Sequence, residues 1–171
     1  SSCSGCMEPY SINYDQYAEV PCCTICDGSD ENSCCVIIDE FHVSTFGDDY
    51  NNNGTGPEDA LRTIRRAVYL AQPQSTIIVH EGTYFEDQTI LIDKDLQIYS
   101  VYHESENESV IGNTIIDGSQ FTDGGSVIKF QDVTDFTKFY GFTVRGGSAG
   151  DGNGGGIYLS NSNPHLKRLI V

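Results

Sequence analysis

All seven cysteines lie within the first 35 residues of the chain, where their thiols can bind a metal ion or form disulfides. The pairs Cys3-x-x-Cys6 and Cys23-x-x-Cys26 have the spacing of a four-cysteine zinc site, because each CxxC turn lets both thiolates face one ion. Disulfides are the interpretation we favour, since a module of this size buries too little apolar surface to fold without staples. The residues concerned are Cys3, Cys6, Cys22, Cys23, Cys26, Cys34 and Cys35.

The cysteine spacing leaves the disulfide connectivity open. Adjacent cysteines, such as Cys22 and Cys23, meet disulfide geometry only with strain, so each is expected to bond elsewhere. Because seven is an odd number, at least one thiol is free, bound to metal or paired with another chain. No cysteine follows residue 35, and this change predicts a Cys-rich module over residues 1–40 and a second domain over residues 41–171.

An Asn- and Asp-rich run that begins at Asp49 matches the first half of a calcium-binding loop. Oxygen-bearing side chains alternate with other residues, and Gly54 permits the sharp turn that such loops need. The closing carboxylate is expected at position 60, which is Ala60, whereas Asp59 lies one residue early. A turn that is rich in Asn and Asp and binds no cation is the other interpretation. With a glycine-rich corner near the C-terminus, the candidate calcium ligands are Asp49, Asn51, Asn53, Asp59, Asp151 and Asn153.

Tyrosine is the aromatic residue available for stacking on sugar rings, because the chain has ten tyrosines and no tryptophan. A tyrosine in a strand can equally serve core packing. The candidates for carbohydrate contact are Tyr84, Tyr99, Tyr140 and Tyr158.

No convergent catalytic cluster is found in the sequence, and no catalytic residue is predicted. Asp117 follows two isoleucines and precedes a glycine, a position where an Asp commonly closes a turn. Arg145 is either an isolated basic group or one half of a salt bridge. None of the histidines has a Cys, His or carboxylate partner at ligand spacing, and structural or exposed positions are expected for His42, His80, His103 and His165.

The formal net charge of −16, with only nine basic residues, argues against binding to nucleic acid or to anionic membranes, which require clusters of Lys and Arg. No apolar run approaches the roughly 20 residues that a membrane-spanning helix needs, so no membrane insertion is expected. Abundant Asn, Gly, Ser and Thr, together with clustered cysteines, favour a secreted or cell-surface protein. The expected partners are further copies of the chain, other surface proteins or a polysaccharide.

One amphipathic helix is expected from Pro57 to Gln72. Thr55 or Gly56 can cap it, Pro57 suits the first helical position, and Pro73 ends it. A single helix before a run of strands most simply covers the open end of the first strands. Its apolar stripe comprises Ala60, Leu61, Ile64, Ala67, Val68 and Ala71.

Short apolar runs that are typical of β-strands recur after this helix. The last run reaches the final residue, so we expect further repeats or another subunit to cover that end. The predicted strands are Thr76–His80, Leu96–Tyr99, Thr114–Asp117, Ser126–Phe130, Phe139–Val144, Gly156–Leu159 and Leu166–Val171.

The start of the chain resembles a short module common in secreted proteins of marine Bacteroidetes-type bacteria. The resemblance rests on residues 5–15, GCMEPYSINYD, and on Asp27-Gly28-Ser29. The chain departs from that module at Asp30, where the module has a cysteine, and in its additional cysteines. The resemblance implies a spacer of a secreted or cell-surface protein rather than a catalyst.

A series of short motifs recurs in a fixed order through the remainder of the chain. In order, the motifs are Gly54-Thr55-Gly56, Gly82-Thr83-Tyr84, Thr114-Ile115-Ile116-Asp117-Gly118, Gly141-Phe142-Thr143 and Gly154-Gly155-Gly156-Ile157-Tyr158. With these motifs the remainder resembles bacterial right-handed β-helix proteins of the pectate-lyase-like type. The resemblance implies an all-β fold: a right-handed parallel β-helix with an N-terminal capping α-helix and the small disulfide-stapled module before it. It implies no single activity, because this family includes polysaccharide lyases, glycoside hydrolases, adhesins and surface proteins.

Three functional hypotheses follow. The first is a secreted or cell-surface structural or adhesive β-helix protein, whose open solenoid end and odd cysteine favour assembly into an extracellular filament. The second is a polysaccharide lyase or glycoside hydrolase, or the carbohydrate-binding part of one. The third is an interaction module stabilised by zinc at the cysteines.

Overall fold

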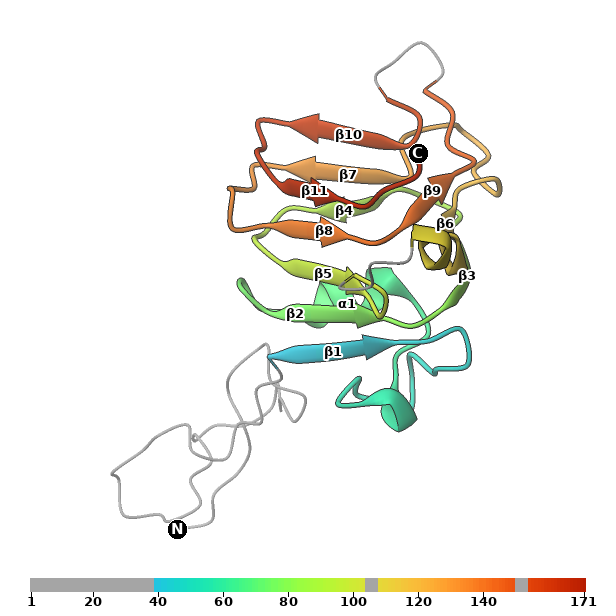
Figure 1. Ribbon diagram of the computed structural model, residues 1–171, viewed down its shortest axis with the longest axis vertical. Helices are drawn as coiled ribbons and strands as arrows, with labels where there is room; N and C mark the ends of the chain where they lie inside the picture. The colour runs from blue at the N-terminus through green and yellow to red at the C-terminus, as the bar shows by residue number, and fades with distance from the viewer. Residues whose placement is uncertain (1–38, 104–107, 150–153) are drawn as a thin grey trace, which may run out of the picture. The chain divides into compact units, whose positions relative to one another are not determined.

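The computed structural model describes residues 39–103, 108–149 and 154–171 (Figure 1). These residues belong to the second of two compact units of the chain, Asp39–Val171. All seven cysteines, together with Asp151 and Asn153, lie outside the described residues. The disulfide and zinc interpretations therefore stay predictions.

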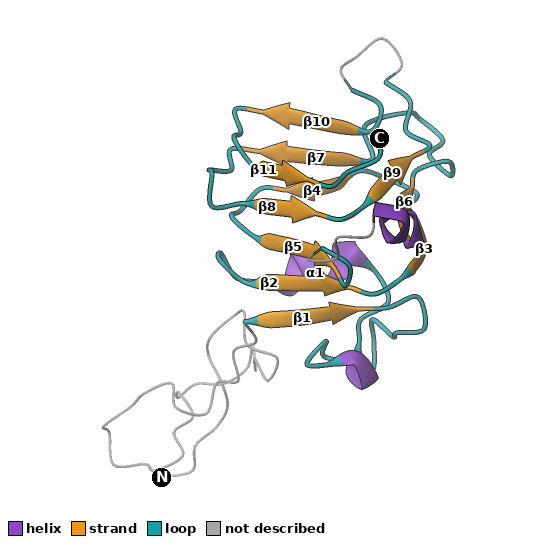
Figure 2. Cartoon of the chain, in the orientation of Figure 1, coloured by secondary structure: helices purple, strands orange, loops and turns teal. Residues whose placement is uncertain are grey.

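The described part of the chain has one short α-helix. Figure 2 shows that strands predominate in it. This confirms the expectation of a β-rich fold. Among the described residues, no helix is long and apolar enough to cross a membrane. The strands are β1 (Glu40–Val43), β2 (Thr76–Val79), β3 (Gly82–Phe85), β4 (Ile90–Ile92), β5 (Gln97–Ser100), β6 (Thr114–Asp117), β7 (Ile128–Gln131), β8 (Lys138–Tyr140), β9 (Thr143–Arg145), β10 (Ile157–Ser160) and β11 (His165–Lys167).

The strands form three parallel sheets with the orders β1-β2-β5-β8-β11, β4-β7-β10 and β3-β6-β9. From β2 onward the chain visits these sheets in a fixed sequence, and every third strand pairs with the strand of the previous visit (Figure 1). Parallel neighbours require long connections rather than tight hairpins, and from β2 onward each connection contains one strand of each of the other two sheets.

Inward-facing apolar side chains stack from strand to strand in the five-stranded sheet. Phe41, Ile77, Ile98 and Phe139 occupy successive paired positions of β1, β2, β5 and β8. Each of these side chains is at most 1% exposed. The core therefore contains a column of apolar side chains, in which each side chain covers the paired side chain of the neighbouring strand.

The predicted helix over residues 57–72 is wrong in its first half. A 3-10 helix, η1 (Pro57–Asp59), is followed by a non-helical segment, and α1 spans only Ile64–Leu70. The chain leaves the helical path because Leu61 forms an isolated parallel bridge with Val43 of β1. A second 3-10 helix, η2, spans Glu108–Asn113.

Polar side chains fix both ends of α1. Asp49 Oδ1 accepts hydrogen bonds from the backbone N–H groups of Arg62 and Thr63, and Thr63 Oγ1 accepts one from the N–H of Arg66. Thr63 is thus the N-cap that defines where the helix begins. At the other end, Lys94 Nζ donates to a backbone carbonyl of the residue that follows the helix.

The predicted apolar stripe of this segment is confirmed, although only part of it is helical. Its burial is decided by contact with the strands and not by helical periodicity alone. At most 5% of each residue is exposed for Ala60, Leu61, Ile64, Ala67, Val68 and Ala71.

The strand predictions succeed unevenly. The run Thr114–Asp117 is β6, with the predicted bounds. The run Phe139–Val144 is two strands in two sheets, β8 and β9, because the chain turns at Gly141, whose φ is 88°. That backbone angle favours glycine, and a Cβ there would collide with the side chain of Ser100. The strands β1, β3 and β4 were missed.

Stability is expected to depend on the aromatic cluster inside the fold. Phe139 stacks on Phe142 with ring centroids 4.4 Å apart and meets Phe130 edge-on at 5.8 Å. We expect Phe139→Ala to lower the free energy of unfolding in urea by about 3–5 kcal/mol, because it leaves a cavity. The control Phe85→Ala changes a side chain that is 58% exposed, and we expect it to cost less than about 1 kcal/mol. Equal losses for the two variants would contradict this account of the core.

Candidate functional site

The outward face of the five-stranded sheet carries polar and aromatic side chains in two columns. Gln97 of β5 pairs with Lys138 of β8, and Tyr99 pairs with Tyr140 two residues further along the same strands. The residues between them are fully buried. Because alternate residues of a strand point to opposite faces, all four named side chains lie on the outward face. The neighbouring strand β11 continues the second column with Lys167.

Tyr99 lies against two other aromatic rings. His103, which follows β5, stacks on Tyr99 with ring centroids 4.4 Å apart and an interplanar angle of 15°. The centroid of the Tyr140 ring lies 5.4 Å from that of Tyr99, with an interplanar angle of 47°. The Tyr99 hydroxyl donates to Gln97 Oε1 at 2.7 Å, and His103 Nδ1 donates to the carbonyl oxygen of Ser100 at 2.9 Å. These contacts hold the rings in place before any ligand arrives, which lowers the entropic cost of binding.

Three cations border these rings. Lys167 Nζ lies 5.9 Å from the centroid of the Tyr140 ring, and the Arg168 guanidinium donates to the carbonyl oxygen of His103 at 3.3 Å. Lys138 Nζ lies 3.2 Å from the side-chain oxygen of its cross-strand partner. Within the described ranges, none of the three cations forms an ion pair with a carboxylate.

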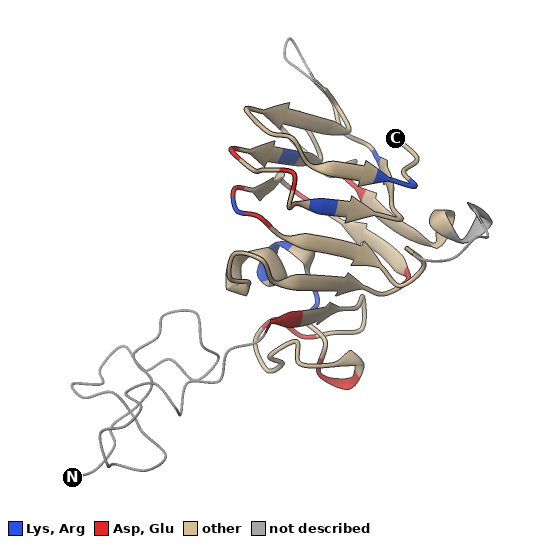
Figure 3. Ribbon diagram, turned by 60° about the vertical axis from the view of Figure 1, so that its left-hand side comes forward, with Lys and Arg blue, Asp and Glu red and all other residues tan. Residues whose placement is uncertain are grey.

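The rings and two of the cations line a cleft of about 370 Å³. Its lining contains no carboxylate, although the chain has a net charge of −16. Figure 3 shows Lys and Arg, in blue, on strands of the sheets and also on the helix and in loops, while Asp and Glu, in red, lie mostly in turns and at the start of β1. The cleft is thus a local excess of positive charge beside flat apolar ring faces. The lining residues are Tyr99, His103, Tyr140, Lys167 and Arg168.

Of the four tyrosines proposed from the sequence for sugar contact, the structure brings Tyr99 and Tyr140 together. Tyr84 is 4% exposed, and its hydroxyl donates to the carbonyl oxygens of Val43 and His80, so its ring packs inside the fold. Burial raises the pKa of this phenol well above its usual value. Tyr158 lies on β10, in another sheet.

Sequence reasoning missed His103, Lys167 and Arg168 as members of this group. His103 and Arg168 are 65 residues apart and meet only because β8 lies between β5 and β11 in the sheet. The pattern of Gln97-x-Tyr99 and Lys138-x-Tyr140, read in register, predicts only that the two tyrosines are neighbours. No comparable sequence signal points to His103, Lys167 or Arg168.

The carboxylates of the predicted calcium loop accept hydrogen bonds from their own surroundings. Asp49 accepts from the start of α1, and Asp59 Oδ2 accepts from the N–H of Asn53. The Asn51 side chain donates to Asp48. In the described segments, no group of three or more His, Cys, Asp or Glu is arranged to hold a metal. The calcium site stays a prediction, and these oxygens demonstrably stabilise turns.

The two alternatives left open for Arg145 are now resolved. Its Nε lies 2.7 Å from Asp117 Oδ2, which confirms the salt bridge. Asp117 Oδ1 also accepts a hydrogen bond from the N–H of Ser119, which confirms that this carboxylate closes a turn.

The prediction that His42 and His80 are isolated is wrong. His42 Nδ1 lies 3.1 Å from His80 Nε2, and His42 Nε2 lies 3.3 Å from Glu40 Oε1. Partial burial lowers the pKa of His80, and the neighbouring His42 lowers it further. The pairing of β1 with β2 brings these groups together across 38 residues of sequence.

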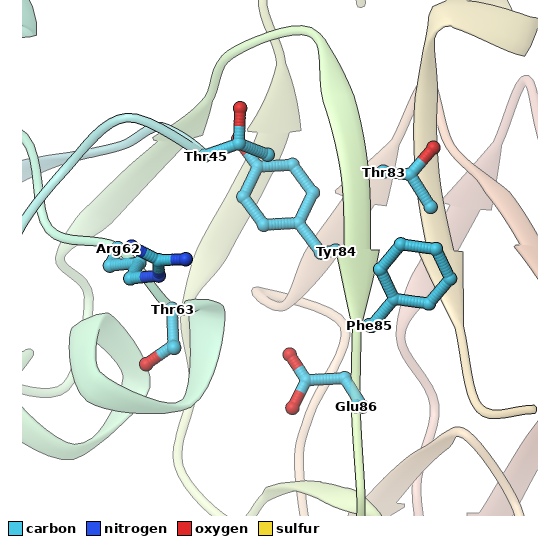
Figure 4. A pocket seen from close by; sticks show the side chains of 7 residues that line it. All are labelled: Thr45, Arg62, Thr63, Thr83, Tyr84, Phe85 and Glu86. Carbon is cyan, nitrogen blue, oxygen red and sulfur yellow. The ribbon is translucent and has the colours of Figure 1, made fainter. Parts of the chain in front are cut away.

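A second, smaller cavity of about 150 Å³ lies beside β3 (Figure 4). Tyr84 and Glu86 project from one side of the strand toward Arg62 and Thr63, whereas Phe85 projects from the other side, as Figure 4 shows. The cavity therefore lies between β3 and the segment that leads into α1.

Glu86 is the most perturbed acid near that cavity. It is 2% exposed, and its Oε2 lies 3.1 Å from Nε of Arg65, which also pairs with Asp87 at 2.9 Å. Burial raises the pKa of Glu86 to about 7, against the opposing effect of Arg65. A perturbed acid in a cavity can mark a functional site. Here the ion pair joins α1 to the end of β3, and we assign it a structural role.

A wider concavity of about 610 Å³ lies beside α1, where the guanidinium of Arg66 lies 5.7 Å from the ring of Tyr69. Its lining also includes Arg65 and Asp49. Arg65 already has two carboxylate partners, and Asp49 adds a negative charge. The lining of this concavity thus includes a carboxylate, which the lining of the cleft on the five-stranded sheet does not.

Comparison of this chain with protein-family models, with curated proteins and with solved structures found no match. Its function is therefore argued from its own residues.

The raised pKa of Glu86 predicts a pH-dependent stability. Between about pH 4.5 and pH 7 the folded state holds a proton on Glu86 that the unfolded state has lost, so the free energy of unfolding falls as the pH rises through this range. The fall is of the order of 3 kcal/mol. The variant Glu86→Gln lacks the contribution of Glu86 to this pH dependence. Urea unfolding of the wild type and the variant at a series of pH values therefore separates the contribution of Glu86 from the contributions of other acids.

The matched control is Glu58→Gln, which changes an exposed carboxylate of η1. We expect this variant to keep the wild-type dependence on pH. If Glu86→Gln and Glu58→Gln follow the same pH profile as the wild type, Glu86 does not carry a raised pKa.

Proposed function

We propose that this chain is part of a secreted or cell-surface protein with a structural and adhesive role, built on a right-handed parallel β-helix. In this proposal the outward face of the five-stranded sheet binds an acidic polysaccharide. The clustered cysteines and the acidic, Lys-poor composition support the extracellular setting.

The order of the strands supports the β-helix part of the proposal. The chain returns to the same sheet at every third strand, and each return adds a parallel strand beside the previous one. In a solenoid each repeat contacts only its neighbours, and equivalent side chains stack from repeat to repeat. The column of Phe41, Ile77, Ile98 and Phe139 is such a stack.

The observation that carries the binding proposal is the group of cations around the stacked rings that have no carboxylate partner among the described residues. A sugar ring has apolar C–H faces that pack on aromatic rings, and Tyr99 and Tyr140 offer two such rings side by side. Lys167 and Arg168 lie at the border of the same cleft without a carboxylate partner among the described residues. A carboxylate or sulfate group on the sugar would neutralise them.

The cleft supports binding more directly than cleavage. Most glycoside hydrolases flank the scissile bond with two carboxyl groups, and the lining of this cleft offers none. The lyase or hydrolase alternative stays a hypothesis. Assembly into a filament and the zinc-stabilised module also stay hypotheses, since both involve residues 1–38, which lie outside the described part.

Binding of the full chain to immobilised polysaccharides tests this proposal. We expect polygalacturonate or a sulfated galactan to bind and a neutral β-glucan to bind at least tenfold more weakly. Tyr99→Ala should weaken binding about tenfold, because an aromatic residue at the centre of a contact is worth about 1–2 kcal/mol. The double variant Lys167→Gln/Arg168→Gln should weaken binding and also reduce its dependence on salt concentration.

Tyr158→Ala is the matched control, because it removes another candidate tyrosine from a different sheet. It should leave binding unchanged. Equal binding of neutral and acidic polysaccharides, or an effect of Tyr158→Ala as large as that of Tyr99→Ala, would contradict the proposal. Thermal unfolding of each variant shows whether it is folded.

A further inference from the structure

Two histidines from adjacent strands meet through their ring nitrogens. His42 belongs to β1, and His80 directly follows β2 and donates its backbone N–H to the carbonyl oxygen of Val43 at 2.8 Å. His42 Nδ1 and His80 Nε2 are 3.1 Å apart, whereas the ring centroids are 5.4 Å apart. The two nitrogens therefore point toward each other, and the ring faces do not stack.

The position of Glu40 bears on which nitrogen of His42 carries a proton. Glu40 Oε1 lies 3.3 Å from His42 Nε2, and both residues are on the same face of β1. A neutral imidazole has one N–H, and a carboxylate accepts hydrogen bonds only. In the neutral form of His42, the contact with Glu40 favours the N–H on Nε2, so that Nδ1 presents a lone pair to His80.

We propose that His42 and His80 together bind a divalent cation of the late first transition row, Zn²⁺ or Cu²⁺, with Glu40 orienting His42. Imidazole nitrogens suit both ions. Two nitrogens that each lie about 2.0–2.1 Å from one tetrahedral zinc ion are separated by about 3.3 Å, close to the separation found here. The cation lies to one side of the line between the two nitrogens, so both rings turn slightly to direct their lone pairs at it. The proton on His80 Nε2 leaves that nitrogen and is taken up by Nδ1 of the same ring, so that both facing nitrogens are free to bind the cation.

The contact of Glu40 with the outer nitrogen of His42 is the arrangement that orients many metal-bound histidines. The side chain of His42 is 15% exposed, so the pair lies near the surface and a cation can reach it. In the described part of the chain, no group of three or more His, Cys, Asp or Glu is arranged around one point. The protein therefore supplies two nitrogen ligands, and water or an oxygen of an external ligand completes the coordination.

This inference is independent of the proposed polysaccharide binding. The alternative explanation of the same geometry is a single N–H···N hydrogen bond that ties β2 to β1. Only the metal-binding explanation requires that both facing nitrogens change their chemical state together when a cation is added.

Nitrogen-detected NMR of the histidine rings tests the proposal on the full chain, with free thiols alkylated and Zn²⁺ as the titrant. We expect the resonances of His42 Nδ1 and His80 Nε2 to shift together and to saturate at one equivalent, while those of His165 stay in place. With Cu²⁺ the electron paramagnetic resonance spectrum should show coupling to two imidazole nitrogens. His42→Ala and His80→Ala should each abolish these signals.

Glu40→Gln should weaken Zn²⁺ binding by about tenfold without abolishing it, because the group that orients His42 is lost and the ligands remain. His165→Ala is the control for the loss of a histidine from the same sheet. Zinc that binds elsewhere and leaves both facing nitrogens unshifted, or that shifts only one of them, would overturn the proposal. The wild-type titration alone decides this, so the test does not depend on the folding of a variant.

Discussion

Parallel pairing in register is the constraint on which the rest of this structure depends. Each residue of a strand lies beside one residue of the strand before it, as Ile77 beside Phe41 and Ile98 beside Ile77. A shift of one residue would turn every inward side chain outward. The apolar columns therefore fix the register, and the register in turn fixes what the outward face presents.

The candidate sites are products of this register. Tyr99 and Tyr140 are distant in sequence and lie side by side because β5 and β8 are neighbours. His42 and His80 meet for the same reason at β1 and β2. In these parallel sheets a candidate site is assembled from residues of neighbouring strands. A side chain on one strand can form such a site only when the neighbouring strand places a suitable side chain beside it.

The dependence on strand pairing explains which features of the fold could be predicted from the sequence and which could not. Apolar runs predict strands because burial acts on each strand separately, and the run Thr114–Asp117 was located correctly. The start of α1 could not be predicted, because it depends on the bridge of Leu61 to Val43. The partners of His42 and Tyr99 could not be predicted either, since the sequence does not state which strands are neighbours.

The distribution of ion pairs separates structural charge from charge that is available for binding. Among the described residues, the two buried carboxylates have cationic partners: Glu86 contacts Arg65, and Asp117 contacts Arg145. A buried charge without a partner is costly, so these pairs are what folding itself requires. Lys167 and Arg168 are different, because no carboxylate among the described residues pairs with them.

Attraction to a carboxylate of the described residues thus does not account for the position of Lys167 and Arg168 beside Tyr140. A protein with a net charge of −16 has many acids that could neutralise them, yet the cleft lining contains none. Excluding carboxylates from this lining keeps its local potential positive. An anionic ligand with flat apolar faces explains both the cations and the rings, whereas either group alone has a simpler structural explanation.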